Sequence, residues 1–287
     1  MQIMTKILDG KEESKKILAE QAIQASKIAK NGYTVGFAML AVGEDPAIIQ
    51  YALSNKRACE KIGILSTFEV MPEESTTQDV YDKIQQLNSD LFVNAILVLT
   101  PLPKHIDARR IMGAINPAKD IDGQTPDNIS MLYSNIKGCF CPSTPLGAMR
   151  LMQKYKIDLD GKHAVIVGRS PVVGKPLALM LLNANATVTV CHTHTQNLTD
   201  ICRRADILIA CAGVPKMIKG NMVKKDAVVI DIGTNFVDGK LCGDVDFDSV
   251  NGIAGAISPV PGGCGPMTVA AMMENVIAAT KKQKHIR

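Results

Sequence analysis

Apolar residues in the first half of the chain form short continuous runs, and amphipathic stretches separate these runs. The run Val35–Val42 predicts a buried strand, and the turn residues from Gly43 to Pro46 end it. The further elements predicted here are a helix around 10–31, a helix at about 47–62, a strand at 67–71, a helix at 77–89 and a strand at 95–99. Continuous apolar strands that alternate with helices predict a parallel sheet covered on both faces.

The second half repeats this alternation. It predicts strands at 163–167, 187–191, 207–210 and 227–232, with a helix at 176–183 between the first two. Between the two runs, Pro142–Pro145 is a plausible hinge, and a linking helix follows through about Tyr155. The pattern predicts an α/β protein of two doubly wound domains, in which ligands bind beyond the carboxyl ends of the strands.

Composition excludes several classes of protein. The chain has 287 residues, 46% of them hydrophobic and 21% charged, which is typical of two packed cores and not of disorder. The net charge is only +4, and there is no basic block, so no nucleic-acid partner is expected. No apolar run reaches the roughly 20 residues of a membrane span, and the eight cysteines form no zinc pattern. We expect a cytoplasmic protein with no membrane partner, structural thiols and no metal.

A glycine-containing loop follows the strand at 163–167. Gly168, Ser170 and Gly174 lie between an apolar strand and a helix, so backbone N–H groups and the helix dipole can receive a pyrophosphate. The alternative is a loop that merely turns a strand into a helix. The next strand ends at 191–195 without an acidic residue for the ribose hydroxyls, which favours NADP over NAD. Arg169, Thr193 and His194 could surround a 2′-phosphate, although a solvated histidine is at least as common.

Three further features are candidates for a substrate site. Tyr51 could stack on a planar ring, and Asp122 could accept two hydrogen bonds from an aminopyrimidine edge, although a core tyrosine and a turn aspartate are the commoner roles. The stretch Pro259–Pro266 holds three prolines and three glycines in eight residues, which favours a rigid wall that a ligand can approach closely.

Along essentially its whole length the chain resembles the methylenetetrahydrofolate dehydrogenase/methenyltetrahydrofolate cyclohydrolase family. The segments that carry the resemblance are Val42–Ala47, Lys56–Gly63, Thr100–Pro103, Lys119–Gly123, Val167–Ser170, Asp231–Gly233, Gly243–Asp246 and Pro259–Thr268. So many matching motifs exclude chance similarity.

The resemblance implies a folate-binding catalytic domain over 1–145, joined by the C-terminal helix 267–287, and a Rossmann-type NAD(P)-binding domain over 146–266, with a cleft between them. It implies NADP-dependent oxidation of 5,10-methylenetetrahydrofolate in one-carbon metabolism, with NAD possible as cofactor, and a homodimer. Site residues follow by the same resemblance. Tyr51 and Asp122 hold the folate, Pro261, Gly262 and Gly263 line the pocket, and Gly168, Arg169, Ser170, Thr193 and Thr234 contact the cofactor.

The chain departs from the family at the catalytic lysine, one helical turn after Tyr51. That position is Asn55, and the neighbouring Lys56 is rotated by about 100° around the helix axis. The family glutamine is Leu99, and the family serine is Ile48. Since neither Asn55 nor Leu99 accepts a proton, we expect the hydrolysis of methenyltetrahydrofolate to 10-formyltetrahydrofolate to be weak or lost.

Two alternatives stay open at this point. One is the ordinary bifunctional dehydrogenase/cyclohydrolase, with Lys56 or another group in the role of the lysine. The other is a folate- or nucleotide-binding paralogue without turnover.

Overall fold

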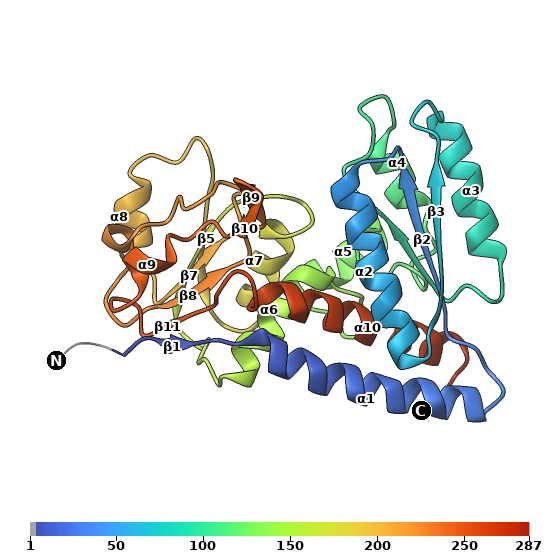
Figure 1. Cartoon of the computed structure of the whole chain (residues 1–287), viewed down its shortest axis with the longest axis horizontal. Helices are drawn as coiled ribbons and strands as arrows, with labels where there is room; N and C mark the ends of the chain where they lie inside the picture. Colours follow the sequence, from blue (N-terminus) through green and yellow to red (C-terminus); the bar gives the residue numbers. More distant parts are fainter. Residues whose placement is uncertain (1–3, 287) are drawn as a thin grey trace. The chain divides into compact units, whose positions relative to one another are not determined.

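The computed structural model describes residues 4–286, which divide into two compact units. Unit 1 combines the chain up to Lys15 with Thr144–Ala271, and unit 2 combines Lys16–Ser143 with Met272–Arg287. The division falls inside two long helices, α1 (Gly10–Lys30) and α10 (Cys264–Gln283), which are drawn in blue and red in Figure 1.

Unit 2 is built on a three-stranded parallel sheet with the order β3-β2-β4. Its elements are β2 (Gly36–Val42), α2 (Pro46–Ile62), β3 (Leu65–Met71), α3 (Thr77–Ser89), β4 (Ala95–Val98), α4 (Ala108–Ala114) and α5 (Pro126–Tyr133). All seven residues of the central strand β2 are buried. Phe37 and Met39 pack in one core cluster with α2 and α10, whereas Ala38 and Leu40 pack in another with α3 and α4. Alternate side chains therefore serve opposite faces, as predicted for a covered sheet.

Local signals set the ends of α2. The Asp45 carboxylate accepts from the backbone N–H of Ala47 at 2.8 Å, and Pro46 occupies the first turn, where its missing N–H costs nothing. Gly63 ends the helix in the left-handed region at φ 79°. The helix is thereby fixed in the register that places Tyr51 and Asn55 one turn apart.

Unit 1 contains a six-stranded parallel sheet with the order β1-β11-β8-β7-β5-β6. The strands are β1 (Lys6–Ile7), β5 (His163–Val167), β6 (Thr187–Cys191), β7 (Ile207–Ala210), β8 (Val228–Asp231) and β11 (Ala256–Ile257). The helices between them are α6 (Ser143–Lys154), α7 (Gly174–Asn183), α8 (Leu198–Cys202) and α9 (Phe247–Val250), with a short 3-10 helix η1 (Gly220–Met222). An antiparallel hairpin, β9 (Asn235–Val237) and β10 (Lys240–Cys242), stands apart from this sheet.

Both sheets are doubly wound. In unit 1, β5 pairs with β6 on one side and with β7 on the other, and in unit 2, β2 lies between β3 and β4. The strand order reverses at these points, so a crevice opens beyond the carboxyl ends of the strands on either side. The predicted fold class is confirmed.

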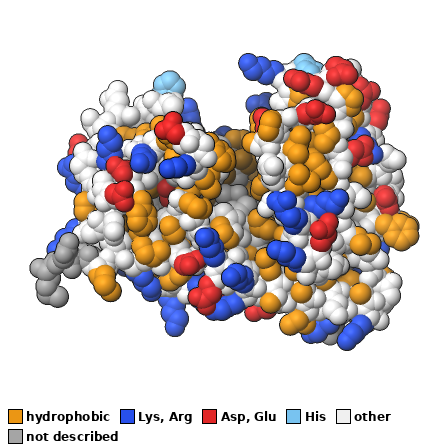
Figure 2. All heavy atoms as spheres, viewed as in Figure 1, with side chains coloured by type: hydrophobic (Ala, Val, Ile, Leu, Met, Phe, Trp, Pro, Cys, Tyr) orange, Lys and Arg blue, Asp and Glu red, His pale blue; other side chains and the backbone are white. Residues whose placement is uncertain are grey.

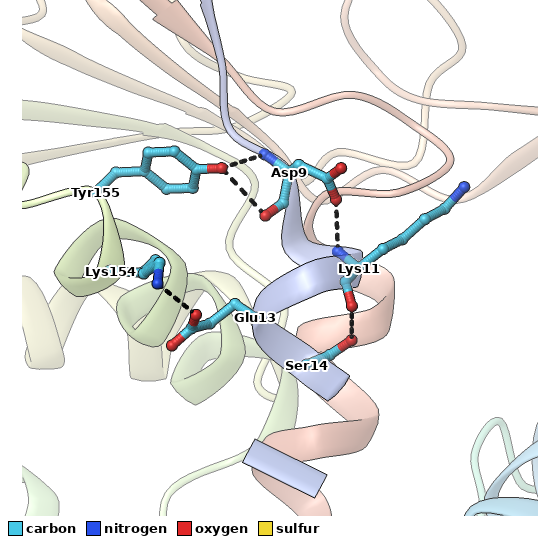
Figure 3. A network of polar contacts seen from close by, with 6 residues as sticks. All are labelled: Asp9, Lys11, Glu13, Ser14, Lys154 and Tyr155. Atoms are coloured by element: carbon cyan, nitrogen blue, oxygen red, sulfur yellow. Dashed lines mark hydrogen bonds and ion pairs between the residues drawn. The ribbon is translucent and has the colours of Figure 1, made fainter. Parts of the chain in front are cut away.

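The beginning of the chain is placed differently from the sequence-based expectation. Residues up to Lys15 belong to unit 1 and not to the first domain, because β1 pairs in parallel with β11. Figure 3 shows further contacts of this segment. The Tyr155 hydroxyl accepts from the Asp9 N–H at 2.9 Å, and Lys154 pairs with Glu13 at 2.7 Å. These contacts tie the start of α1 to the end of α6.

The described helices include none that is long and apolar enough to cross a membrane. On the face drawn in Figure 2, basic side chains are interspersed with acidic ones.

Candidate functional site

A cavity of about 420 Å³ opens in unit 2 beyond the carboxyl ends of β2 and β4. The loops after these two strands form most of it, and Ile48 from α2 and Glu73 from the β3–α3 loop complete it. Its lining consists of Val42, Gly43, Glu44, Asp45, Ile48, Glu73, Pro101, Leu102 and Pro103. This is the edge where a doubly wound sheet binds ligands.

Tyr51 and Asn55 lie on α2. The Tyr51 residue is 37% exposed, but its hydroxyl end is buried, which raises the pKa of the phenol; the negative charge of Asp122 raises it further. Asn55 is completely buried next to this hydroxyl and lowers the same pKa, yet neither atom of its amide completes a hydrogen bond with a described residue. Lys56 is not among the buried residues of α2, so it projects from a different part of the helix surface.

Asp122 lies in the loop before α5, and its carboxyl group is buried. One carboxylate oxygen accepts from Gln124 Nε2 at 2.7 Å and the other from the Ser143 backbone N–H at 2.9 Å. Burial raises the pKa of Asp122, and these donors oppose the shift without cancelling it. The charge of Asp122 raises the pKa of Tyr51, which places the carboxyl near the phenol.

The neighbouring residues of the Lys119–Gly123 motif have structural tasks. The Lys119 ammonium donates to the carbonyls of Leu87, Asn88 and Asp90 at 2.7–3.0 Å and so caps the end of α3. Asp120 accepts from the Thr125 N–H at 2.8 Å and fixes the turn. Asp122 is thus the residue of this motif whose carboxyl faces Tyr51.

The two other departures from the family are part of the hydrophobic core. Leu99 and Ile48 are 4% and 6% exposed and belong to the cluster between β2 and α2. Apolar packing has taken the place of the polar side chains that the family carries there.

In unit 1, the loop after β5 has the geometry of a dinucleotide-binding turn. Ser170 Oγ accepts from the Val173 N–H at 3.1 Å, which leads the chain into α7. Gly168 has φ +137°, and a Cβ there would overlap the carbonyl of Cys211 after β7. A Cβ on Gly174 would overlap the Gly168 carbonyl. Both glycines are required for the chain to pass this point, and the N-terminus of α7 is left facing the crevice.

Two histidines follow β6, and Arg169 of this loop lies near them. His192 has a lowered pKa, which desolvation causes first and the positive charges of Arg169 and His194 increase. The rings of His192 and His194 lie 6.0 Å apart, and Thr193 between them is exposed. Arg169 is exposed as well. The structure therefore places Arg169 and His194 near His192, with the exposed Thr193 between the two histidines in the chain; their role toward a 2′-phosphate stays a prediction.

Two buried aspartates connect the loops after β7 and β8. Asp244 accepts from the N–H groups of Ala212 and Gly213 at 2.6 and 2.9 Å, and from Asn235 Nδ2 at 2.8 Å. Asp231 accepts from the N–H groups of Gly233, Asp244 and Val245 at 2.9–3.0 Å. Burial nevertheless raises the pKa of Asp231 to about 6. These hydrogen bonds of Asp231 and Asp244, here called the interlock, fix the loop that carries the exposed Thr234.

The proline- and glycine-rich stretch is shorter than expected, because α10 begins at Cys264 and takes up Gly265 and Pro266 in its first turn. Gly262 accepts from the Gly10 N–H at 2.8 Å, and both Gly262 and Gly263 are buried, whereas Pro261 is exposed. The first turn of α1 therefore packs directly against this wall.

The predicted folate residues Tyr51 and Asp122 belong to unit 2, whereas Pro261–Gly263 and the cofactor residues belong to unit 1. Sequence reasoning missed Gln124 and Ser143, which donate to Asp122, and Asn235, which donates to Asp244. The motifs Asp231–Gly233 and Gly243–Asp246 drew attention to the two aspartates but gave them no task.

The cysteines and acidic residues show no metal site. Within residues 4–286, no three His, Cys, Asp or Glu side chains are grouped so that they could hold an ion. The eight cysteines are free, and burial raises the pKa of Cys59, Cys202, Cys211 and Cys264 to about 12, so these four remain thiols at neutral pH.

Two family models match the chain. Residues 8–122 match the tetrahydrofolate dehydrogenase/cyclohydrolase catalytic domain, and residues 142–284 match the NAD(P)-binding domain of the same family. A relative named bifunctional protein FolD from Acetivibrio thermocellus is 48% identical over 98% of this chain and 99% of its own. One of the same name from Methanospirillum hungatei is 49% identical over 94% of this chain and 95% of its own.

Solved structures of enzymes with the same family name share this fold over nearly the whole chain. The bifunctional FolD dehydrogenase/cyclohydrolase of Campylobacter jejuni superimposes with a TM-score of 0.95 and 42% identity, covering 97% of this chain and 99% of its own. The Trypanosoma brucei enzyme, solved with NADP and an inhibitor, gives a TM-score of 0.94 and 30% identity over 98% and 99% of the two chains. Two domain models, whole-length relatives and the geometry of both sheets agree, and the chain belongs to the tetrahydrofolate dehydrogenase/cyclohydrolase family.

Proposed function

We propose that the protein oxidises 5,10-methylenetetrahydrofolate to 5,10-methenyltetrahydrofolate with NADP and then hydrolyses the product to 10-formyltetrahydrofolate. The observation that carries this proposal is the match of both units, over nearly the whole chain, to relatives named bifunctional. A binder without turnover would need no paired folate and dinucleotide sites, so the enzyme is the better explanation.

The oxidation removes a hydride, with its electron pair, from the methylene carbon and leaves a cationic methenyl bridge. NADP, when bound, accepts this hydride at its nicotinamide ring. The chain's own contribution is to bind and orient the two reactants. Gly168, Ser170 and the N-terminus of α7 suit the pyrophosphate. Arg169 and the two histidines that follow β6 suit the 2′-phosphate, and Thr234 lies on the loop that Asp244 fixes.

On the folate side, Tyr51 would stack against the aminobenzoyl portion, and Asp122 would accept from the pterin edge. One side-chain donor, Gln124 Nε2, and one backbone donor, the Ser143 N–H, hold the Asp122 carboxyl in place. Such a fixed carboxylate can read an aminopyrimidine edge with two parallel hydrogen bonds.

Hydrolysis adds water to the methenyl carbon, breaks the bond from this carbon to the ring nitrogen and releases one proton overall. The relatives' names support the ordinary bifunctional enzyme and give no support to the prediction that this step is weak or lost. Asn55 does not ionise, and burial of the Tyr51 hydroxyl keeps it protonated. Asp122 is the acidic side chain of this cluster, so it or solvent takes the proton.

Two assays on the purified protein test the proposal. Formation of reduced nicotinamide reports the dehydrogenase, and loss of methenyl absorbance reports the hydrolysis. Both steps should proceed, with NADP preferred to NAD. A protein that binds folate but reduces neither cofactor would refute the enzyme in favour of a binding paralogue.

Two variants locate the hydrolytic group. Asn55→Lys restores the family residue and should speed hydrolysis, by up to about 10²-fold for a positioned proton acceptor. Lys56→Met should leave hydrolysis unchanged, because Lys56 lies off the buried face of α2. If Lys56→Met abolished hydrolysis, Lys56 and not position 55 would hold the role of the family lysine.

We also propose a homodimer and a cytoplasmic location. The domain roles proposed are folate binding and catalysis for the first part of the chain and the C-terminal helix, and cofactor binding for the remainder. Size-exclusion chromatography with light scattering tests the dimer.

A further inference from the structure

The polar cluster around Asp122 contains two buried groups that the protein itself leaves without partners. Asn55 is 0% exposed, and neither its Oδ1 nor its Nδ2 has a hydrogen-bond partner among the described residues. Ser143 is 1% exposed, and its Oγ is equally unpartnered. Buried polar groups are nearly always paired in native proteins, because an unpaired one forfeits its hydrogen bonds to water.

These two groups belong to one spot. Asn55 lies beside the Tyr51 hydroxyl, and the Ser143 N–H donates to Asp122 Oδ1 at 2.9 Å, which places the Ser143 hydroxyl next to this carboxyl without a completed hydrogen bond. The charge of Asp122 in turn raises the pKa of Tyr51. Both orphan groups therefore adjoin the Tyr51–Asp122 pair, where the folate is proposed to bind.

Two other buried asparagines of this unit do have hydrogen-bond partners. Asn275, a buried asparagine of the same unit, donates to the carbonyls of Ile121 and Cys141 at 2.7 and 2.9 Å, on either side of the Asp122–Ser143 contact. Asn128 likewise donates to Asp120 at 2.9 Å. Of these four buried residues, Asn55 and Ser143 are the two whose side chains lack a partner among the described residues.

We propose that Asn55 and Ser143 are binding residues that donate to and accept from the polar edge of the folate ligand beside Asp122. The inference rests on the proposed function and deepens it, because it assigns a task to the asparagine that replaces the family lysine and to a serine with no assigned role. A pterin ring offers a carbonyl and ring nitrogens as acceptors and N–H groups as donors. An uncharged amide and a hydroxyl can satisfy both kinds, and their contribution does not depend on pH.

The test exploits opposite effects on stability and on binding. Asn55→Leu replaces an unpaired amide by an apolar group of similar size. The ligand-free protein should unfold at the same or a higher temperature, since removal of an unsatisfied buried group relieves a cost. Affinity for tetrahydrofolate, measured by calorimetry without cofactor, should fall about 5- to 50-fold, because a ligand group then stays unpaired. Ser143→Ala should show the same pattern with a smaller, about 3- to 10-fold loss.

Asn275→Leu is the matched control, because its amide has two partners. The same substitution there should lower the unfolding temperature clearly. Affinity for NADP should stay within about twofold of the parent in Asn55→Leu and Ser143→Ala, because the proposed contacts are to folate only.

Two outcomes would overturn the inference. A lower unfolding temperature for Asn55→Leu, like that of Asn275→Leu, would mean that the amide has a structural partner. An unchanged affinity for tetrahydrofolate in both variants would mean that the two side chains form hydrogen bonds to bound water and not to folate. Failure of the proposed function is distinguishable from both, since the parent protein would then neither bind tetrahydrofolate nor reduce NADP.

Discussion

Replacement of Asn235 by aspartate would place a second carboxylate against Asp244. The Asn235 Nδ2 donates to Asp244 Oδ1 at 2.8 Å, and Asp244 is fully buried. Two unit charges at this distance repel by about 6 kcal/mol at an effective dielectric constant of about 20. The pair can avoid this repulsion by holding one proton. At pH 7, protonation of a carboxyl with an ordinary pKa near 3.9 costs about 4 kcal/mol. The expected loss of stability for Asn235→Asp is therefore capped at about 4 kcal/mol.

The sign of the pH dependence follows from this cap. In the folded state the pair has a raised pKa, so the proton is bound more tightly than in the unfolded chain. The penalty is absent below about pH 4 and grows by about 1.4 kcal/mol per pH unit above it. Urea denaturation followed by circular dichroism at pH 5 to 8 should show a loss of about 1.5 kcal/mol at pH 5 and about 4 kcal/mol at pH 7.

Exchange of donor and acceptor provides the control. In the double variant Asp244→Asn/Asn235→Asp, an amide again faces a carboxylate, so most of the stability should return. Affinity for NADP should fall in Asn235→Asp and recover in the double variant, since the interlock holds the loop of Thr234. Equal losses at pH 5 and pH 8, or a double variant no better than the single one, would refute the electrostatic argument.

Three further substitutions test other parts of the structure. Lys119→Met removes three hydrogen bonds to carbonyls at the end of α3 and should destabilise the protein by about 2–4 kcal/mol in urea denaturation; a loss below about 0.5 kcal/mol would contradict the capping role. Gly168→Ala forces a Cβ onto the Cys211 carbonyl at φ +137° and should weaken NADP binding at least about tenfold in a fluorescence titration, whereas unchanged binding would place the dinucleotide elsewhere. Arg169→Gln should raise the KM for NADP about tenfold and leave that for NAD within about twofold, and equal changes would argue against a 2′-phosphate contact.

The sequence by itself determined most elements and predicted at which edge of each sheet a ligand would bind. The strands at 163–167, 187–191 and 207–210 and the helix at 77–89 have the predicted bounds, because continuous apolar runs and turn residues are local signals. Gly168 and Ser170 could be assigned to a phosphate loop for the same reason, since glycine, strand and helix adjoin in the chain. The family motifs added Tyr51 and Asp122, and the missing lysine was visible as Asn55.

Only the tertiary structure decided how distant residues complete each other. β1 has two residues and therefore no hydrophobic periodicity. Its partner strand β11 lies about 250 residues later in the chain, so the local sequence pattern could not predict that the two strands pair. The Ser143 N–H reaches Asp122 over a separation of 21 residues, and Asp244 meets Ala212 over 32. Whether a polar atom is satisfied depends on such partners, and for this reason the unpaired amide of Asn55 became visible only in the folded chain.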